Sequence, residues 1–204
     1  MVRNLESGRR AALVVSEMQN GISNAAYNDT PLIGQVAARD LPARINRLAA
    51  GFRHAGLPVI HCTISARPDF RGWPVNCFLA ARIAREGQLV HGSSFAAIHD
   101  DIALHETDIV SARHHGMTPF TGTDLAATLR AFGTDTVVFA GVSTNVALMG
   151  GSAEAVGNGF AVVIAEDCTA GGTAETHQIQ ITMHLPLIAT ISSMDAILAS
   201  EALQ

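Results

Sequence analysis

Residues 135–151, DTVVFAGVSTNVALMGG, decide the fold prediction for this chain. The first part, DTVVFAGV (135–142), is predicted to be a strand buried on both faces, because its apolar residues are continuous rather than alternating. The residues STN that follow are typical of a turn into a helix, and helical spacing continues over 145–159. We therefore expect a strand, a turn and a helix, with free backbone N–H groups at the start of the helix.

The same alternation of strand and helix recurs along the chain. Further apolar strands are expected at 11–16, 57–64, 108–112, 160–167 and 188–193, and further helical spacing at 41–56, 123–133 and 174–187. Six such strands predict an α/β fold: a three-layer, doubly wound, Rossmann-like and mostly parallel six-stranded sheet with helices on both faces. We interpret residues 1–204 as a single domain of this kind.

Residues 66–107 do not follow this alternation and are too long for a plain connection. We interpret them as a lid or subunit-contact excursion with a short helix near residues 76–85. They contain Trp73, the only tryptophan of the chain, which we expect to fill a seam between subunits rather than to cover a pocket.

Composition limits the kind of partner. Of the 204 residues, 48% are hydrophobic and 15% charged, so we expect a homo-oligomer, a dimer or tetramer, in which sister subunits cover apolar surface. The net charge of -5 without a basic cluster excludes a nucleic-acid partner and favours a small-molecule substrate. Three cysteines without a CxxC pair and no long apolar run predict a cytoplasmic protein with reduced thiols and no membrane segment.

Neither a metal nor a cofactor is expected. The histidines lack the spacing and the carboxylate neighbours of a metal site. The glycines at 150, 151, 157 and 159 lie within and after the predicted helix rather than before it, so they form no phosphate loop.

Polar residues follow three of the predicted strands. Glu17 comes directly after the first strand, Arg113 and His114 after the third, and Ser143 after the fourth. Because parallel strands of such a sheet bring their carboxyl ends to one edge, we expect these residues to line a common pocket.

Four motifs follow one another along the chain: ALVVSEMQNG (12–21), PFTGTDLAATLRAFGTDTVVFAGVSTNV (119–146), AVVIAEDCTAG (161–171) and HLPLIATISS (184–193). Taken in this order, they resemble the isochorismatase-like, or cysteine hydrolase, superfamily. The resemblance implies a catalytic Asp, Lys and Cys, and the corresponding positions here hold Glu17, His114 and Ala147. Contacts with substrate are expected from the residues around them, namely Gln19, Arg113, Phe120, Val142, Ser143 and Thr144, although Thr144 also fits a helix cap.

The resemblance further implies a non-proline cis peptide bond between Val142 and Ser143. The backbone N–H groups of Ser143 and Ala147 would then form a cradle for an oxyanion.

Three hypotheses about function remain open. The first is a small-molecule hydrolase without a covalent intermediate, because Ala147 cannot attack a substrate. In this hypothesis Glu17 acts as general acid or base, and His114 and Arg113 supply or balance charge at the site. Isochorismatases that lack the cysteine, which protonate a vinyl ether, support it by resemblance. The second is an amidase-type hydrolase with a recruited nucleophile, Cys62 or Cys168. The third is a non-catalytic binding protein on the hydrolase fold.

Overall fold

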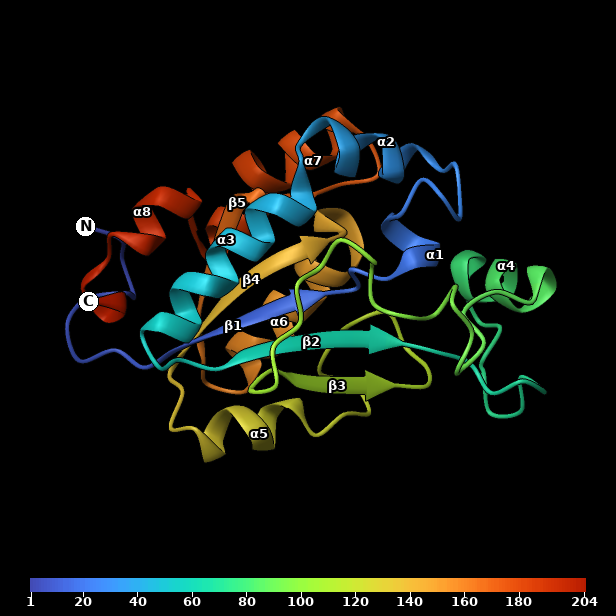
Figure 1. Cartoon of the computed structure of the whole chain (residues 1–204), viewed down its shortest axis with the longest axis horizontal. Helices are drawn as coiled ribbons and strands as arrows, with labels where there is room; N and C mark the ends of the chain where they lie inside the picture. The colour runs from blue at the N-terminus through green and yellow to red at the C-terminus, as the bar shows by residue number, and fades with distance from the viewer.

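The computed structural model describes all 204 residues and contains one six-stranded sheet (Figure 1). The strand order is β3-β2-β1-β4-β5-β6, and every neighbouring pair is parallel. The strands are β1 (Ala11–Ser16), β2 (Val59–Ile64), β3 (Ile109–Arg113), β4 (Thr136–Val142), β5 (Ala161–Ala170) and β6 (Thr190–Ser192). The α/β prediction is confirmed, and the chain reverses its direction of winding between β1 and β4, where ligands bind in folds of this type.

Helices connect successive strands and cover both faces of the sheet. The α-helices are α1 (Asn20–Ser23), α2 (Pro31–Ala38), α3 (Leu41–His54), α4 (Phe78–Glu86), α5 (Leu125–Ala131), α6 (Met149–Gly157), α7 (Ala174–Ile179) and α8 (Met194–Leu198). Shorter π and 3-10 turns are η1 (Thr144–Leu148), η2 (Gln180–His184), η3 (Leu185–Leu187) and η4 (Glu201–Leu203).

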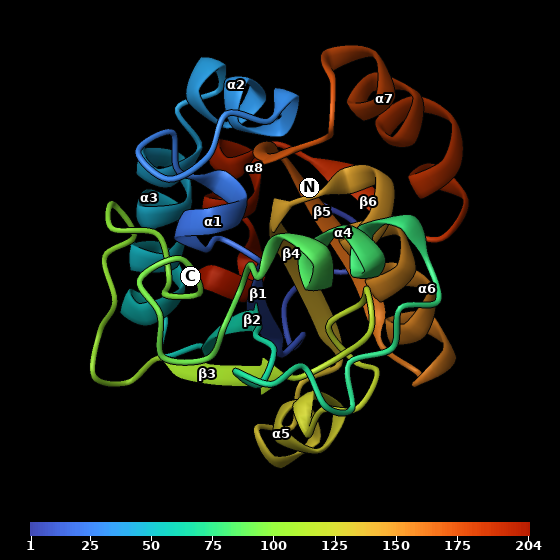
Figure 2. The ribbon, with the colours of Figure 1, turned by 90° about the vertical axis from the view of Figure 1, so that its right-hand side faces the viewer.

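Two hydrophobic layers explain why the strands are apolar along their whole length. In β4, Val138 and Ala140 pack in the layer that contains α3 and α8, whereas Val137 and Phe139 pack in the layer that contains α5 and α6. Successive side chains of a strand point to opposite faces, so burial on both faces requires a continuous apolar run. The helices on the two sides of the sheet are visible in Figure 2.

Three helices, α1, α2 and α8, were not predicted from the sequence. The single turn of α1 depends on distant contacts: the side-chain Nδ2 of Asn20 donates hydrogen bonds to the Ser94 carbonyl oxygen at 3.0 Å and to an Asp100 carboxylate oxygen at 2.9 Å. Helix α2 begins at Pro31, a residue that is favourable at the first position of a helix. Such short elements carry too little periodicity to be recognised without their neighbours.

The excursion of residues 66–107 crosses the carboxyl ends of the strands. Its one helix, α4, lies in front of the strand ends together with α1 in Figure 2. Trp73 is 7% exposed, and its indole N–H donates to the Ala80 carbonyl oxygen at 3.0 Å. Trp73 therefore fastens α4 within its own chain, and the expectation that it fills a seam between subunits is wrong.

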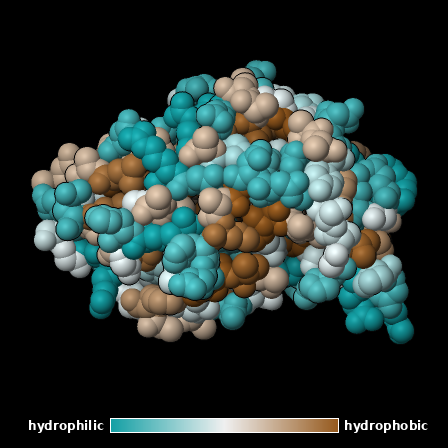
Figure 3. Space-filling model, viewed as in Figure 1, coloured by the Kyte–Doolittle hydropathy of each residue, from teal (hydrophilic) through white to brown (hydrophobic).

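The edge strand β3 leaves apolar surface uncovered. Val110 is 52% exposed, and hydrophobic atoms reach the surface over β2 and β3 in Figure 3. An unpaired strand edge with an apolar face is a feature that proteins usually cover. The homo-oligomer, a dimer or tetramer, stays a prediction. Among the helices, none combines the length and the hydropathy needed to cross a membrane.

Gly141 is the position in β4 where a side chain is least tolerable. Its φ of +96° lies in a region that L-residues rarely adopt, and an added Cβ would lie 2.2 Å from the carbonyl oxygen of Ser16 in β1. We expect Gly141→Ala to lower the free energy of unfolding by about 2–4 kcal/mol in urea titrations.

Gly157 provides the matched control for this variant. It ends α6, and a Cβ there meets nothing within 4 Å. Gly157→Ala should change stability by less than about 1 kcal/mol, and an equally small effect of Gly141→Ala would contradict the close approach of β1 and β4.

Candidate active site

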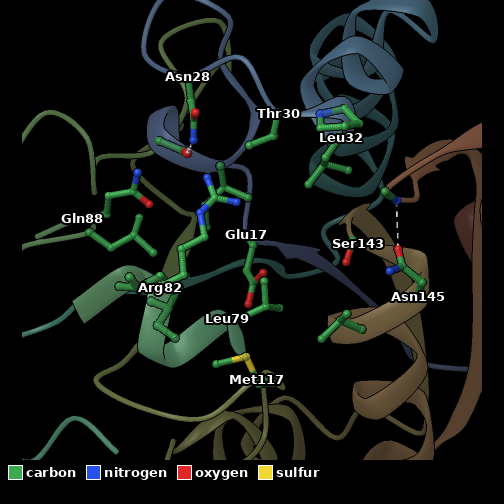
Figure 4. A pocket seen from close by; sticks show the side chains of 18 of the residues that line it. Glu17, Asn28, Thr30, Leu32, Leu79, Arg82, Gln88, Met117, Ser143 and Asn145 are labelled. Carbon is green, nitrogen blue, oxygen red and sulfur yellow. Dashed lines mark hydrogen bonds between the residues drawn. The ribbon is translucent and has the colours of Figure 1, made fainter. Parts of the chain in front are cut away.

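A cavity of about 430 Å³ lies at the carboxyl ends of the strands. Side chains reach it from the ends of β1, β2 and β4, from the segment between α1 and α2, from α4 and from the start of α7. Figure 4 shows Glu17 near its middle, with Ser143 on the side where η1 begins. Of the residues expected to line a common pocket at the strand ends, Glu17 and Ser143 line this cavity.

Glu17 is held in an unusual backbone conformation. Its φ is +52°, in the left-handed region that non-glycine residues seldom occupy. The backbone N–H of Glu17 donates to the Cys62 carbonyl oxygen at 2.9 Å, and its carbonyl oxygen accepts from the N–H of Gln19 at 2.8 Å. These bonds turn the chain sharply as it leaves β1 and direct the carboxyl group into the cavity. Such locally strained conformations cluster at functional sites.

The carboxyl group of Glu17 forms an ion pair with Arg113 at the end of β3. The Glu17 side chain is 15% exposed and that of Arg113 is 1% exposed. Burial raises the pKa of Glu17 above its usual value, and the Arg113 charge opposes this only in part. The pair therefore places a carboxyl group with a raised pKa next to a buried guanidinium group.

The ion pair with Glu17 does not provide partners for all the hydrogen-bond donors of Arg113. Its Nε and Nη1 atoms are buried and have no hydrogen-bond partner, and only Nη2 donates to Glu17. Unpaired donors in a buried cation are costly, so the chain retains Arg113 at some expense in stability.

Glu17 and Arg82 are the only charged side chains that line the cavity, and no histidine or cysteine lines it. Nine of the lining residues are hydrophobic, among them Leu32, Leu79 and Met117. Glu17 is consequently the one side chain in the cavity suited to general acid–base catalysis. No group of three or more His, Cys, Asp or Glu side chains is arranged to hold a metal ion.

His114, the residue aligned with the expected lysine, lies outside the cavity. It is exposed, and its Nδ1 lies 3.0 Å from the carbonyl oxygen of Ser65. The neighbouring residue Arg113, at the last position of β3, points to Glu17 instead. Because successive side chains of a strand alternate in direction, only one of the two can face the acid.

Several expected substrate contacts are engaged elsewhere. The amide of Gln19 donates to the carbonyl oxygens of Ile64 and Ala96 and accepts from the N–H of Ile64 at 2.8 Å, so its polar atoms link the end of β2 to the 66–107 excursion. Phe120 packs beside Phe160 in the core at a ring distance of 6.2 Å. Neither side chain lines the cavity. We leave both out of the proposed site.

The segment after β4 divides between cavity and core. Val142 and Ala147 are 0% and 1% exposed and do not line the cavity, whereas Ser143 and Asn145 do. The Val142–Ser143 peptide bond is cis, as the sequence comparison implied. Ala147 lies within η1, in the helical turn that follows β4.

A series of hydrogen-bonded polar side chains behind this segment was not predicted. Thr144, which is fully buried, lies with its Oγ1 3.3 Å from Nδ1 of His177, whose Nε2 is 3.0 Å from a carboxylate oxygen of Glu166. Arg39 forms an ion pair with the same carboxylate. The hydrogen bond from His177, together with that from Arg39, holds the pKa of Glu166 at about 2 against the effect of burial. This series of hydrogen-bonded side chains fixes the turn at Thr144 beside the cavity.

The cysteines offer no thiolate to the cavity. Burial raises the pKa of Cys62 to about 12 and that of Cys168 to about 12. Only Cys77 is exposed, and it borders a different hollow. We expect iodoacetamide at pH 8 to modify Cys77 alone in the folded protein, as measured by peptide mass spectrometry, and rapid labelling of Cys62 would contradict its burial.

Comparisons with known proteins agree with this architecture. The isochorismatase domain family matches residues 11–196. The "Uncharacterized isochorismatase family protein YecD" of Escherichia coli O157:H7 is 32% identical over 195 residues, covering 94% of this chain and 96% of that protein. Maleamate amidohydrolase of Pseudomonas putida is 27% identical over 176 residues, covering 85% of this chain and 78% of that protein.

Solved structures show the same fold. A cysteine hydrolase from Pseudomonas syringae pv. phaseolicola superposes with a TM-score of 0.83 at 19% identity, covering 97% of this chain and 95% of that one. The chain thus shares the α/β fold of this structure, with a cavity at its strand ends. The chain belongs to the isochorismatase family of hydrolases.

Proposed function

We propose that the protein is a small-molecule hydrolase that works by acid–base chemistry from Glu17, without a covalent intermediate on cysteine. One observation carries the proposal: Glu17 is the only carboxyl group that lines the cavity, and no histidine or cysteine lines it. Its raised pKa suits a general acid, and its partner Arg113 stabilises the carboxylate that remains after the proton has left.

The proposed reaction is hydrolysis by proton transfers through Glu17. Protonated Glu17 gives its proton to the substrate, either to the leaving heteroatom of an amide or ester or to the carbon of a vinyl ether. Water adds to the electrophilic carbon, and the proton released from that water returns to the Glu17 carboxylate. In an amide or ester the bond from the carbonyl carbon to the protonated heteroatom then breaks. In a vinyl ether the hemiketal collapses: Glu17 protonates the leaving oxygen, the carbon–oxygen bond breaks, and the hemiketal hydroxyl gives its proton back to Glu17. Backbone N–H groups of the 143–147 turn are suited to stabilise negative charge that develops on the substrate. His114 has no part in this mechanism, because it lies outside the cavity.

The absence of a thiol in the cavity separates this proposal from a cysteine mechanism. Position 147 is alanine, and the buried thiols of Cys62 and Cys168 have pKa values of about 12. A recruited cysteine nucleophile would need a lowered pKa and an open approach from the cavity. The relatives include a maleamate amidohydrolase, so an amide belongs among the first bonds to test.

The experiment is a turnover screen of small amides, carbamoyl compounds, esters and vinyl ethers. Iodoacetamide-treated protein should turn over any substrate as fast as untreated protein, and intact-mass spectra during turnover should show no covalent adduct. A trapped acyl-enzyme or loss of activity on alkylation of a buried cysteine would overturn the proposal. Ligands that stabilise the fold without any turnover would identify a binding protein instead.

A further inference from the structure

The two charged side chains of the cavity belong to different parts of the fold. Glu17 ends the central strand β1, whereas Arg82 comes from α4 in the excursion over the strand ends. Figure 4 shows the Arg82 side chain extending across the cavity toward Asn28, away from the Glu17 carboxyl group. A substrate in this space would therefore meet an acid at one end and a cation at the other.

The charge of Arg82 is only partly neutralised by its own helix. Its Nε donates to a carboxylate oxygen of Glu86 at 3.1 Å, and the same carboxylate accepts a second bond from Arg85 at 3.2 Å. Two cations thus share one anion, which leaves a net charge of one. The terminal nitrogens of Arg82, Nη1 and Nη2, make no hydrogen bond within the chain, and the side chain is 32% exposed.

The surroundings of Arg82 fit a small planar anion. Gln88, Asn28 and Thr30 add uncharged polar groups on its side of the cavity. Apolar side chains, among them Leu79 and Met117, also line the cavity. A pair of free Nη donors matches the two oxygens of a carboxylate, and one net charge balances a monoanion better than a phosphate dianion beside Glu86.

We propose that Arg82 binds a carboxylate of the substrate, so that the protein acts on small molecules with a carboxylate at one end, an apolar body, and the reacting bond at the Glu17 end. The position of the reacting bond rests on the proposed function. The carboxylate contact itself does not, because it is a binding event that needs no turnover.

The test uses three size-matched probes: trans-cinnamate, its neutral amide cinnamamide, and phenyl phosphate. Calorimetry on the full chain should show cinnamate binding at least about tenfold more tightly than the amide, as expected for a charge-assisted pair of hydrogen bonds. Arg82→Gln should weaken cinnamate binding about 10- to 100-fold and leave the amide unchanged. Arg82→Lys, which keeps the charge but loses the paired donors, should fall between the two.

Arg85→Gln is the matched control, because Arg85 lies on the same helix, contacts the same Glu86 and does not line the cavity. It should bind cinnamate as the wild type does. Equal cinnamate affinity in Arg82→Gln and wild type, or no preference for cinnamate over its amide in the wild type, would overturn the proposal. Tighter binding of phenyl phosphate than of cinnamate would overturn the assignment to a carboxylate.

The failure of this proposal and the failure of the proposed function are distinguishable. Glu17→Gln protein should bind cinnamate with the preference of the wild type, since Arg82 is unchanged. If that preference depends on Arg82 but no substrate is ever turned over, the carboxylate site stands and the hydrolase proposal fails. If turnover depends on Glu17 but KM is the same in Arg82→Gln for carboxylate substrates, the carboxylate site fails alone.

Discussion

Glu17→Gln is expected to lower kcat by about 10³-fold or more on any substrate found, with ligand affinity changed by less than about threefold. Glutamine keeps the size of the side chain and can still accept a hydrogen bond from Arg113, but it cannot donate the proton to a leaving group. No other proton-transferring side chain lines the cavity to replace it. Steady-state kinetics and calorimetry on the same variant separate the two effects.

Glu17→Asp is the companion variant. It keeps the acid and withdraws it by roughly 1.5 Å, the length of one methylene. A loss of about 10- to 100-fold is expected, since misplacement on that scale weakens proton transfer without removing it. Activity in Glu17→Gln equal to that of the wild type would remove Glu17 from the mechanism altogether.

The pH dependence follows from the direction of the Glu17 pKa. Burial raises that pKa above 4.5, and the protonated form is the active general acid. We therefore expect kcat/KM to be highest below the raised pKa and to fall as pH rises through it. A profile that instead rises with pH would assign Glu17 the role of a general base.

Arg113→Met is expected to produce the largest loss of stability among single changes at the site. Removing one partner of a buried ion pair leaves an uncompensated charge, at a cost of about 3–5 kcal/mol near pH 7. We expect the lower end of this range, because two donors of Arg113 already lack partners and their removal relieves a penalty. Urea titrations monitored by circular dichroism measure the change.

The pH dependence of this loss tests its electrostatic origin. Glu17 has a higher pKa in the folded state than in the unfolded chain, so its contribution to stability is present below pH 4.5 and is lost as pH rises through the raised pKa. Without Arg113 that pKa rises further. The deficit of Arg113→Met should therefore be smallest near pH 4 and increase toward pH 8.

The double variant Glu17→Gln, Arg113→Met is the control for packing. It removes both charges, so it should be more stable at pH 7 than Arg113→Met alone. If the double variant is no more stable than Arg113→Met, and the deficit is the same at every pH, the loss would come from packing around residue 113 rather than from the charge of Glu17.

The sequence predicted the sheet well because periodicity reports burial directly. The continuous apolar run at 11–16 has the bounds of β1, and the helix expected at 41–56 corresponds to α3. The strand expected at 160–167 was too short, since β5 continues to Ala170. Glu166 and Asp167 interrupt its apolar pattern, yet both are paired in the fold, with Arg39 and Arg44 respectively. Partners so distant in sequence leave no local signal.

The choice between Arg113 and His114 shows where sequence reasoning about the site stops. The motif placed the expected cation at the end of β3, and two basic residues stand there in succession. A shift of one residue in a strand exchanges the two faces, so sequence alignment alone does not decide which side chain meets Glu17. The packing of β3 against β2 directs Arg113 inward and leaves His114 beside Ser65.

By itself, the sequence determined the α/β class, the order of strands and helices, and the acid at the end of β1, because these depend on periodicity and on the common edge at which parallel strands end. Only the tertiary structure decided that Arg113 pairs with this acid, that the Gln19 amide bonds to Ile64 and Ala96, and that Arg82 enters the cavity from α4. Each of these depends on the direction of a side chain relative to residues far away in the chain, which only packing fixes.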